Sequence, residues 1–139
     1  MKKEAYLVLL ILLGISGHTL ASNSITKNLI GHWFVVEKNY NYSSDEPVNY
    51  KETVTYNFIF NDDGTGFWMV EIEKKQTDDK SEKTEQKFNY KWKVQDDKIV
   101  LDFYEMNRSF ESSFEVLDSV LTLTDPENNT RKYSKKLDN

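Results

Sequence analysis

Few residues of this chain have the types and spacing that chemistry requires. Histidine occurs twice, at His18 and His32, and cysteine does not occur at all. A metal centre usually needs several nitrogen, sulfur or carboxylate ligands at workable spacing, and thiol catalysis needs a cysteine. Acid–base catalysis needs a cluster of titratable groups, and the apolar faces of the sequence carry almost none. We therefore expect no catalytic residue, no metal site and no cofactor, and we expect that the protein is not an enzyme.

Two acidic motifs have structural interpretations that are simpler than a binding site. Residues 61–66 read Asn-Asp-Asp-Gly-Thr-Gly and resemble the start of a calcium loop. In the twelve-residue register that begins at Asn61, however, the position of the final bidentate glutamate is Ile72, so the motif predicts a hairpin turn instead. Glu71 and Glu73 lie two residues apart on the polar face of a predicted strand, where a role in solubility is the default.

Aromatic residues are the remaining functional signal, at 14% of the chain. One hypothesis is that a subset of them binds a lipophilic or ring-bearing molecule. The alternative is that they fill the interior, because a core of this size without disulfides needs many bulky side chains. The residues that we expect to bind such a ligand are Tyr42, Tyr50, Tyr56, Phe88, Tyr90, Phe103 and Phe110.

The elements that must position these residues are β-strands, because the dominant hydrophobic period is two. Phe88, Tyr90, Trp92 and Val94 alternate with polar residues, which predicts one dry and one wet face. The same alternation recurs in residues 29–37, 54–60, 68–72, 99–103, 110–116, 120–124 and 130–136. The connections are too short for helical crossovers, so we predict an all-β fold, a single antiparallel up-and-down β-barrel of about eight strands. Trp33, Phe58 and Trp92 should be buried, and Lys91 and Lys93 exposed.

The connections predict a barrel with two unlike ends. Tight turns are expected at residues 62–66, 95–98 and 118–119, which alternate with the other connections along the chain. Longer loops are expected at residues 38–52 and at the charged segment 74–85, which mixes both signs without apolar anchors and predicts a solvated loop. Consecutive connections of an up-and-down sheet alternate between its ends. The layout is therefore that of a cup, closed by the tight turns and open at the long loops.

The start of the first strand resembles the entry motif of the lipocalin family. Gly31 and Trp33 form a Gly-x-Trp, and it is followed by aromatic strands, the Asp-Gly-Thr-Gly turn and a Phe-x-Tyr-x-Trp strand. This order is similar to that of small exported bacterial lipocalin-like domains, over residues 29–136. The resemblance implies a calycin-like barrel that holds a small hydrophobic molecule. In the family an arginine late in the last strand commonly packs on the tryptophan, and here the late cations are Lys132, Lys135 and Lys136.

The N-terminus has the pattern of a secretory signal peptide. Basic residues at positions 2 and 3 precede an apolar run over residues 5–15, and small residues follow, with Ala21 at the expected cleavage site. We therefore expect a leader over residues 1–21 and one mature lipocalin-like domain over residues 22–139, secreted or periplasmic. The apolar run is shorter than a membrane span, so we expect none after cleavage. Without a cysteine we expect no lipoprotein anchor.

Three functional hypotheses remain, and a hydrolytic or isomerising enzyme ranks last because the predicted interior holds almost no titratable groups. The chain has a net charge of -5, which disfavours a phosphate-binding surface, and we expect no nucleic-acid partner. The first hypothesis is an exported domain that binds a small hydrophobic ligand in the barrel. The alternative is a non-enzymatic protein-interaction module of the cell envelope, with a solid core, that contacts an envelope partner through its long loops or an open sheet edge.

Overall fold

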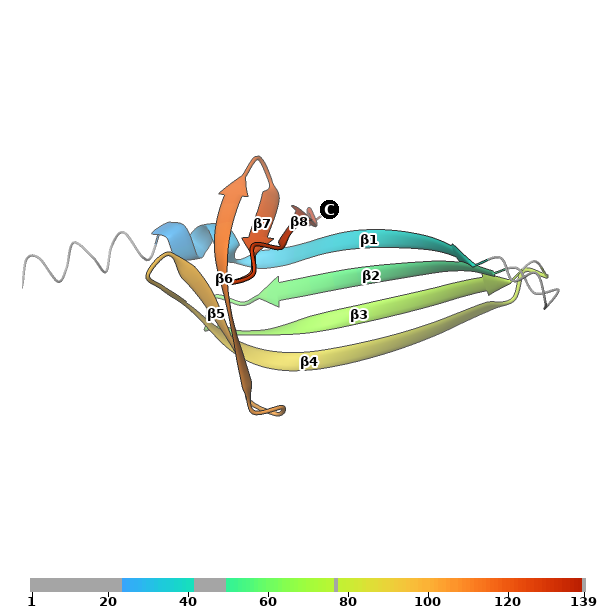
Figure 1. Cartoon of the computed structure of the whole chain (residues 1–139), viewed down its shortest axis with the longest axis horizontal. Helices are drawn as coiled ribbons and strands as arrows, with labels where there is room; N and C mark the ends of the chain where they lie inside the picture. The colour runs from blue at the N-terminus through green and yellow to red at the C-terminus, as the bar shows by residue number, and fades with distance from the viewer. Residues whose placement is uncertain (1–23, 42–49, 77, 139) are drawn as a thin grey trace, which may run out of the picture.

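A closed antiparallel β-barrel forms the body of the protein (Figure 1). The structure is a computed structural model that describes residues 24–41, 50–76 and 78–138. The predicted leader therefore lies outside the described residues, as does Tyr42. A short helix over residues 24–29 precedes the barrel. The strands are β1 (Gly31–Asn41), β2 (Tyr50–Phe60), β3 (Thr65–Gln76), β4 (Ser81–Gln95), β5 (Lys98–Phe103), β6 (Arg108–Leu117), β7 (Val120–Thr124) and β8 (Thr130–Lys135).

The strand order confirms the predicted fold class. Each strand pairs antiparallel with the next along the chain, and β8 pairs with β1 to close the barrel. The described residues thus form an all-β, eight-stranded up-and-down barrel with one short helix, which is consistent with a calycin-like fold. In the described part of the chain, no helix is both long and apolar enough to cross a membrane.

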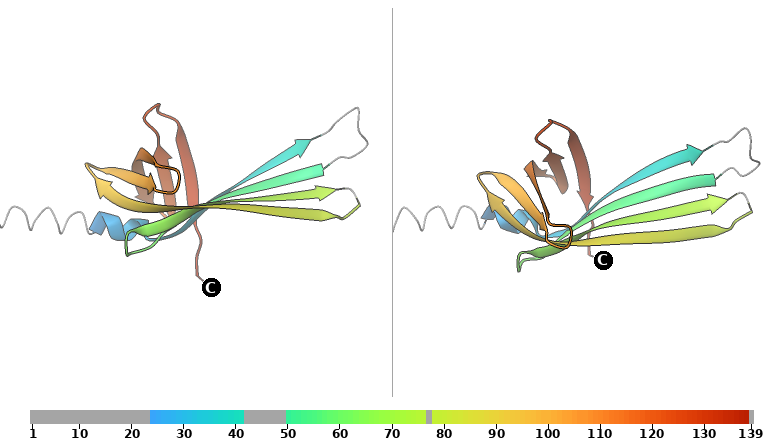
Figure 2. Two further views of the ribbon diagram at one scale, coloured as in Figure 1. Left: turned by 90° about the horizontal axis from the view of Figure 1, so that it is seen from below. Right: turned by 60° about the horizontal axis from the view of Figure 1, so that its bottom comes forward.

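Strands β1 to β4 are much longer than the barrel that they help to close. β3 and β4 pair from Thr65 opposite Lys91 to Lys75 opposite Ser81, whereas β4 pairs with β5 only from Lys91 onward. On the other side, β1 pairs with β8 only at residues 33 and 34. The remaining lengths form a four-stranded sheet that extends away from β5–β8 (Figure 2). We call this part the projecting sheet: residues 35–41, 50–56, 70–76 and 81–86.

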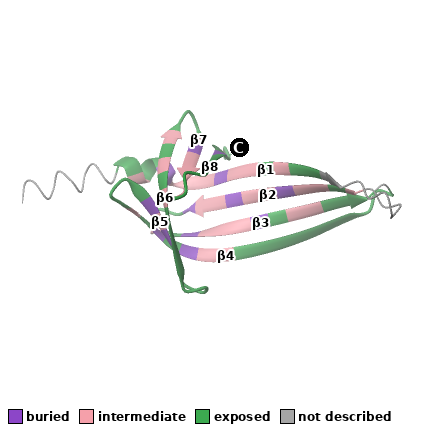
Figure 3. Ribbon diagram, in the orientation of Figure 1, coloured by how far each residue is buried: buried purple, intermediate pink, exposed green. Residues whose placement is uncertain are grey.

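The hydrophobic core fills the end of the barrel where β1 begins. Its most completely buried side chains are Leu29, Trp33, Phe60, Tyr90, Ile99 and Leu121. The short helix covers this end, because buried Leu29 accepts a hydrogen bond through its carbonyl from Trp33 Nε1 at 2.8 Å. Figure 3 shows that buried positions gather here, while the far part of β4 is exposed. Trp33 and Trp92 are buried and Lys91 and Lys93 exposed, as predicted.

The seam between β1 and β8 is short and is reinforced by side chains. Lys136 N donates to His32 O at 2.8 Å beyond the two paired positions. Lys135 Nζ lies 5.4 Å from the centroid of the Trp33 ring. A cation on the face of an indole is attracted by the ring quadrupole. Lys135 of β8 therefore adds a cation–π contact to the short β1–β8 seam.

The three tight turns confirm which end of the barrel is closed. Residues 61–64, 96–97 and 118–119 connect β2–β3, β4–β5 and β6–β7. Asp96, Asp97, Asp118 and Ser119 all have positive φ, the conformation of two-residue type I′ hairpins, whose twist matches the strands. Asp63 stabilises the first turn by accepting hydrogen bonds from the backbone and hydroxyl of Thr65.

The predictions of two long loops at the other end are wrong where the structure describes them. β1 continues to Asn41 and β2 begins at Tyr50, so residues 38–41 and 50–52 are strand. β3 reaches Gln76 and β4 begins at Ser81, so most of the predicted solvated loop is also strand. Backbone pairing forms this hairpin, and opposite charges support it: Lys74 faces Glu82, and Lys83 faces Glu73.

Burial of a tyrosine makes the barrel sensitive to alkaline pH. The Tyr90 hydroxyl donates to Ile59 O at 2.6 Å, and burial raises the pKa of Tyr90 well above its ordinary value. A raised folded-state pKa gives stability that is full below the unfolded value, near 10.0, and is lost as pH rises above it. We expect urea-unfolding midpoints to fall above about pH 10, and to fall less steeply in Tyr90→Phe. Identical pH profiles for the two proteins would contradict this assignment.

Candidate ligand cavity

A cavity of about 440 Å³ adjoins the hydrophobic core, because the buried side chains of Leu101, Phe103 and Tyr133 line it. The residues around it come from β2, β3 and β5–β8 and from the β7–β8 turn: Phe58, Trp68, Leu101, Phe103, Phe110, Ser112, Leu123, Asp125, Asn129, Thr130, Arg131 and Tyr133. The wall is mainly aromatic and aliphatic, and its polar groups gather at the β7–β8 turn. We call this space the ligand cavity.

Strand alternation positions the apolar wall. On each strand the inward side chain recurs at every second residue, so Phe58 and its β3 partner Trp68 share the interior with Phe110 of β6. The rings pack against one another. The ring centroids of Trp68 and Phe58 are 6.4 Å apart, and those of Phe103 and Phe110, which meet edge to face, are 5.5 Å apart. Phe110 remains 50% exposed, which places it at the mouth rather than in the core. The wall is therefore built from rings already held by their neighbours.

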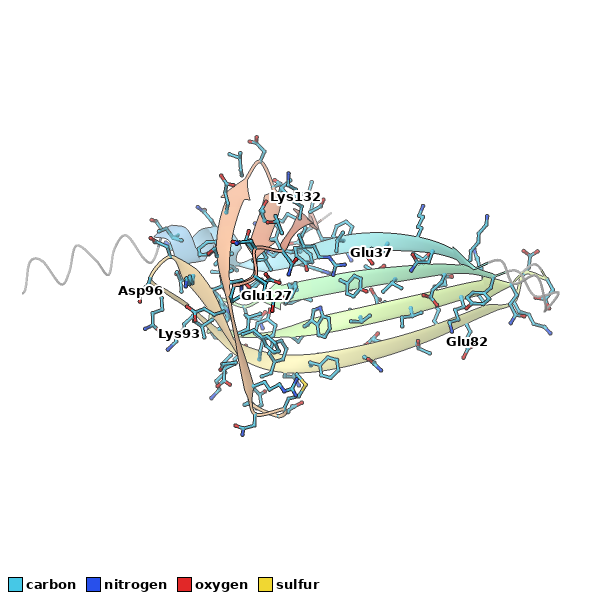
Figure 4. All side chains as sticks on the ribbon, in the orientation of Figure 1. Glu37, Glu82, Lys93, Asp96, Glu127 and Lys132 are labelled. Atoms are coloured by element: carbon cyan, nitrogen blue, oxygen red, sulfur yellow. The ribbon has the colours of Figure 1, made fainter. Side chains whose placement is uncertain are left out.

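Arg131 is the cation of the cavity wall. Its guanidinium pairs with the Glu37 carboxylate across the β1–β8 seam and lies 4.5 Å from the centroid of the Tyr56 ring. Figure 4 shows Glu37 on β1, beyond the part of the strand that β8 covers. Burial raises the pKa of the neighbouring Tyr133 and Arg131 opposes that rise, so the phenol stays neutral at physiological pH. Arginine has five N–H donors, and one carboxylate does not use them all.

The β7–β8 turn forms a pre-organised polar rim. The Asp125 carboxylate accepts hydrogen bonds from the side-chain amide and backbone of Asn129 and from Glu127 N, each at 2.9 Å. The hydrogen bonds from Asn129 are the main cause that lowers the pKa of Asp125. The turn therefore contributes a fixed edge to the cavity, and the lowered pKa of Asp125 keeps its carboxylate negatively charged there.

The predicted ligand-binding residues lie at different depths. Phe103 and Phe110 line the cavity. Tyr56 and Phe88 do not line the cavity; their rings stack beside Trp68, with centroids 6.5 and 5.5 Å from that of Trp68. Tyr90 is 1% exposed and belongs to the core.

Tyr50 lies much farther from the cavity. It is six residues before Tyr56 on β2, about 20 Å along the strand. Lys74 Nζ lies 5.5 Å from the centroid of its ring. Ligand binding by the predicted residues remains a prediction.

Ten of the cavity residues were not among the predicted ligand-binding residues, and Phe58, Trp68 and Arg131 show why. Phe58 and Trp68 have the inward periodicity in the sequence, but Phe58 was expected in the core, and it is only partly buried because the cavity exposes it. Arg131 gives no signal in the sequence, since its partners Glu37 and Tyr56 are distant along the chain. Its position on the inward face of β8 could have been predicted only from strand alternation, because Arg131 lies two residues before Tyr133.

A polar network also lies on the outer face of the sheet. His32 Nε2 is 2.6 Å from Asn57 Oδ1, and Asn57 Nδ2 donates to Glu71 Oε2 at 3.0 Å. Asn57 is 2% exposed and all its polar atoms have partners. Within the described residues, no group of three or more histidines, cysteines or carboxylates could hold a metal ion. The network stabilises the β1–β2–β3 surface.

No family model matches the chain, and no curated protein matches it. The resemblance to lipocalins is therefore supported at the level of the barrel architecture.

Proposed function

We propose that this protein is a lipocalin-like binding protein that carries a small apolar molecule in the ligand cavity. The single observation behind the proposal is a cavity of about 440 Å³ with rings on its walls and an opening to solvent. Its volume lies within the range of small-molecule sites, which are mostly apolar with a few placed polar groups. The leader pattern of residues 1–21 supports a place outside the cytoplasm for this function.

The wall supports a ligand with one apolar body and one hydrogen-bond acceptor. The body would lie against Phe58, Trp68 and Phe103, and burial of its surface would supply most of the affinity. Arg131 would donate to the acceptor from the rim, since its pair with Glu37 leaves donors to spare. Because the rings contact one another before binding, little side-chain entropy would be lost on association.

The alternative of an interaction module with a solid core has weaker support. The core is solid at the closed end, around Trp33 and Tyr90, but the open end holds the cavity. An interaction through a sheet edge remains compatible with a hollow barrel, because the edges belong to the projecting sheet.

Filling the cavity tests the proposal. Ser112 faces the cavity from β6, and the exposed Ser113 beside it faces away. We expect the fluorescent probe N-phenyl-1-naphthylamine to bind the wild-type protein and Ser113→Phe alike, and to bind Ser112→Phe at least about tenfold more weakly. Trp68 should report the binding by quenching, because Trp33 and Trp92 are buried in the core. Quenching should therefore be weaker in Trp68→Phe than in the wild-type protein.

An anionic probe, compared with the neutral one, tests whether Arg131 binds the polar end of the ligand. 1-Anilinonaphthalene-8-sulfonate should bind more weakly to Arg131→Leu than to the wild-type protein, while the neutral probe should lose little affinity. Absence of binding of either probe to the folded wild-type protein, or equal binding to Ser112→Phe and Ser113→Phe, would refute the proposed cavity function.

A further inference from the structure

One side of β4 pairs with β3, and part of its other side is open. β3 pairs with all of residues 81–91, whereas β5 begins to pair with β4 at Lys91. Asn89 is already engaged, since its amide donates to Glu105 of the β5–β6 turn at 3.2 Å. We therefore define the free edge of β4 as residues 81–88. Figure 4 shows Glu82 on this length, far from the turn that carries Asp96.

The backbone groups of the free edge alternate in direction. Gln76 N donates to Lys80 O at 3.0 Å, and Trp92 N donates to Gly64 O at 2.8 Å, at the two ends of the β3–β4 register. Even-numbered residues of β4 therefore bond to β3, and odd-numbered residues direct their N–H and C=O groups away from it. Lys83, Glu85 and Lys87 thus present unpaired backbone groups to solvent along one line. Such a line is a template for another strand.

The charges of the free edge complement a second copy of the same edge in one antiparallel register. Odd-numbered residues must face odd-numbered residues for the backbone bonds to form. A two-fold axis at Thr84 places Lys83 opposite Glu85 of the other copy, twice, and Ser81 opposite Lys87. An axis at Glu85 would oppose glutamate to glutamate and Lys83 to Lys87, which like-charge repulsion disfavours. The pattern therefore distinguishes between neighbouring registers.

Contacts within the chain also favour the register at Thr84. An axis at Gln86 would need Lys87 as the partner of Glu85, but Lys87 Nζ already lies 4.0 Å from the centroid of the Phe67 ring. Lys83 is available, because its pair with Glu73 is long, at 4.0 Å, and its side chain is 76% exposed. Glu85 faces Glu71 across the β3–β4 pair, so a lysine from a second copy would relieve a repulsion between like charges.

From these observations we propose that the protein forms a symmetric dimer through its free β4 edges. Two projecting sheets join antiparallel about Thr84 into one continuous sheet, and the lysine–glutamate pairs fix the register. The interface is isologous, so the same edge is used by both copies and assembly closes at two. The two cavities stay open, because the barrel bodies lie at the outer ends of the joined sheet.

Charge reversal tests the dimer by measuring its dissociation constant in sedimentation equilibrium. We expect the wild-type protein to be dimeric, and Glu85→Lys and Lys83→Glu each to dissociate at least about tenfold more readily, since each puts like charges opposite each other. The double variant Lys83→Glu/Glu85→Lys restores the pairs with opposite polarity and should dimerise like the wild-type protein. Circular dichroism checks that every variant folds.

Lys87→Glu is the matched control, because it makes the same charge change on the same face of the same strand. Its opposite residue in the proposed register is Ser81, so it should leave the dimer intact. A wild-type monomer at concentrations up to about 1 mM would overturn the proposal. Failure of the double variant to restore association, or loss of the dimer in Lys87→Glu, would overturn it as well.

Discussion

Replacing Trp92 with alanine should lower the free energy of unfolding by about 3 to 5 kcal/mol. Trp92 is 6% exposed, and its ring meets Phe60 edge to face at 5.3 Å. Its Nε1 donates to both Asn61 O and Thr65 O at 3.0 Å, so it also anchors the β2–β3 turn. Alanine would leave a cavity in the closed end of the barrel and remove one of the two hydrogen bonds that Asn61 O and Thr65 O each accept. Urea titration followed by circular dichroism measures the loss.

Lys91→Ala is the matched control for the tryptophan. Lys91 precedes Trp92 on β4 but lies on the outer face and is exposed. Removing it should change the free energy of unfolding by no more than about 0.5 kcal/mol. Equal unfolding midpoints for the two variants would show that the assignment of inner and outer faces is wrong.

The barrel could be predicted from the sequence because its strands have one buried face. Around Trp92 and Lys91, burial on one face imposes a period of two on the residue types. Hairpin chemistry adds independent information, since Asp96 and Asp97 suit the positive φ of a two-residue turn. The number of strands, their order and the closed end follow from these two local signals.

The far part of the projecting sheet could not be predicted in the same way, because its side chains are polar on both faces. Residues 74–76 and 81–85 carry polar side chains on either face, so no hydrophobic period marks them as strands. Their pairing depends on the opposite strand, as in Lys74 with Glu82. Such partners are only found once the register is known, and a charged strand therefore resembles a loop in the sequence.

Whether an inward side chain lines the ligand cavity depends on its position along the barrel axis. The alternation of apolar and polar residues does not encode that position. Tyr90 and Phe103 both point inward and both are buried, yet Phe103 reaches the cavity and Tyr90 does not line it. The small side chain of Ser112 leaves space at a level where neighbouring strands supply rings. The sequence therefore predicted the inward faces but not the boundary between filled and open interior.

Replacing Gly66 with alanine should destabilise the closed end by about 3 kcal/mol or more. Tyr90 on β4 reaches across β3 to donate its hydroxyl to Ile59 O on β2, and its ring passes directly over Gly66. A Cβ at Gly66 would lie 2.0 Å from Ile59 O and 2.7 Å from a ring carbon of Tyr90. Because the first of these atoms is backbone, relief requires β2 and β3 to move apart. The free energy of unfolding in urea measures the cost.

Tyr90→Phe separates this clash from the loss of the hydrogen bond. It removes the hydroxyl and keeps the ring, so it should cost about 0.5 to 1.5 kcal/mol for the lost hydrogen bond to Ile59 O. Gly66→Ala should cost more, because it displaces both the ring and the β2–β3 backbone while leaving the hydroxyl in place. It should also weaken the alkaline loss of stability, since a displaced Tyr90 is less buried and its pKa is raised less. If Gly66→Ala unfolds at the wild-type urea concentration with an unchanged pH profile, the glycine is not what lets Tyr90 seal the barrel.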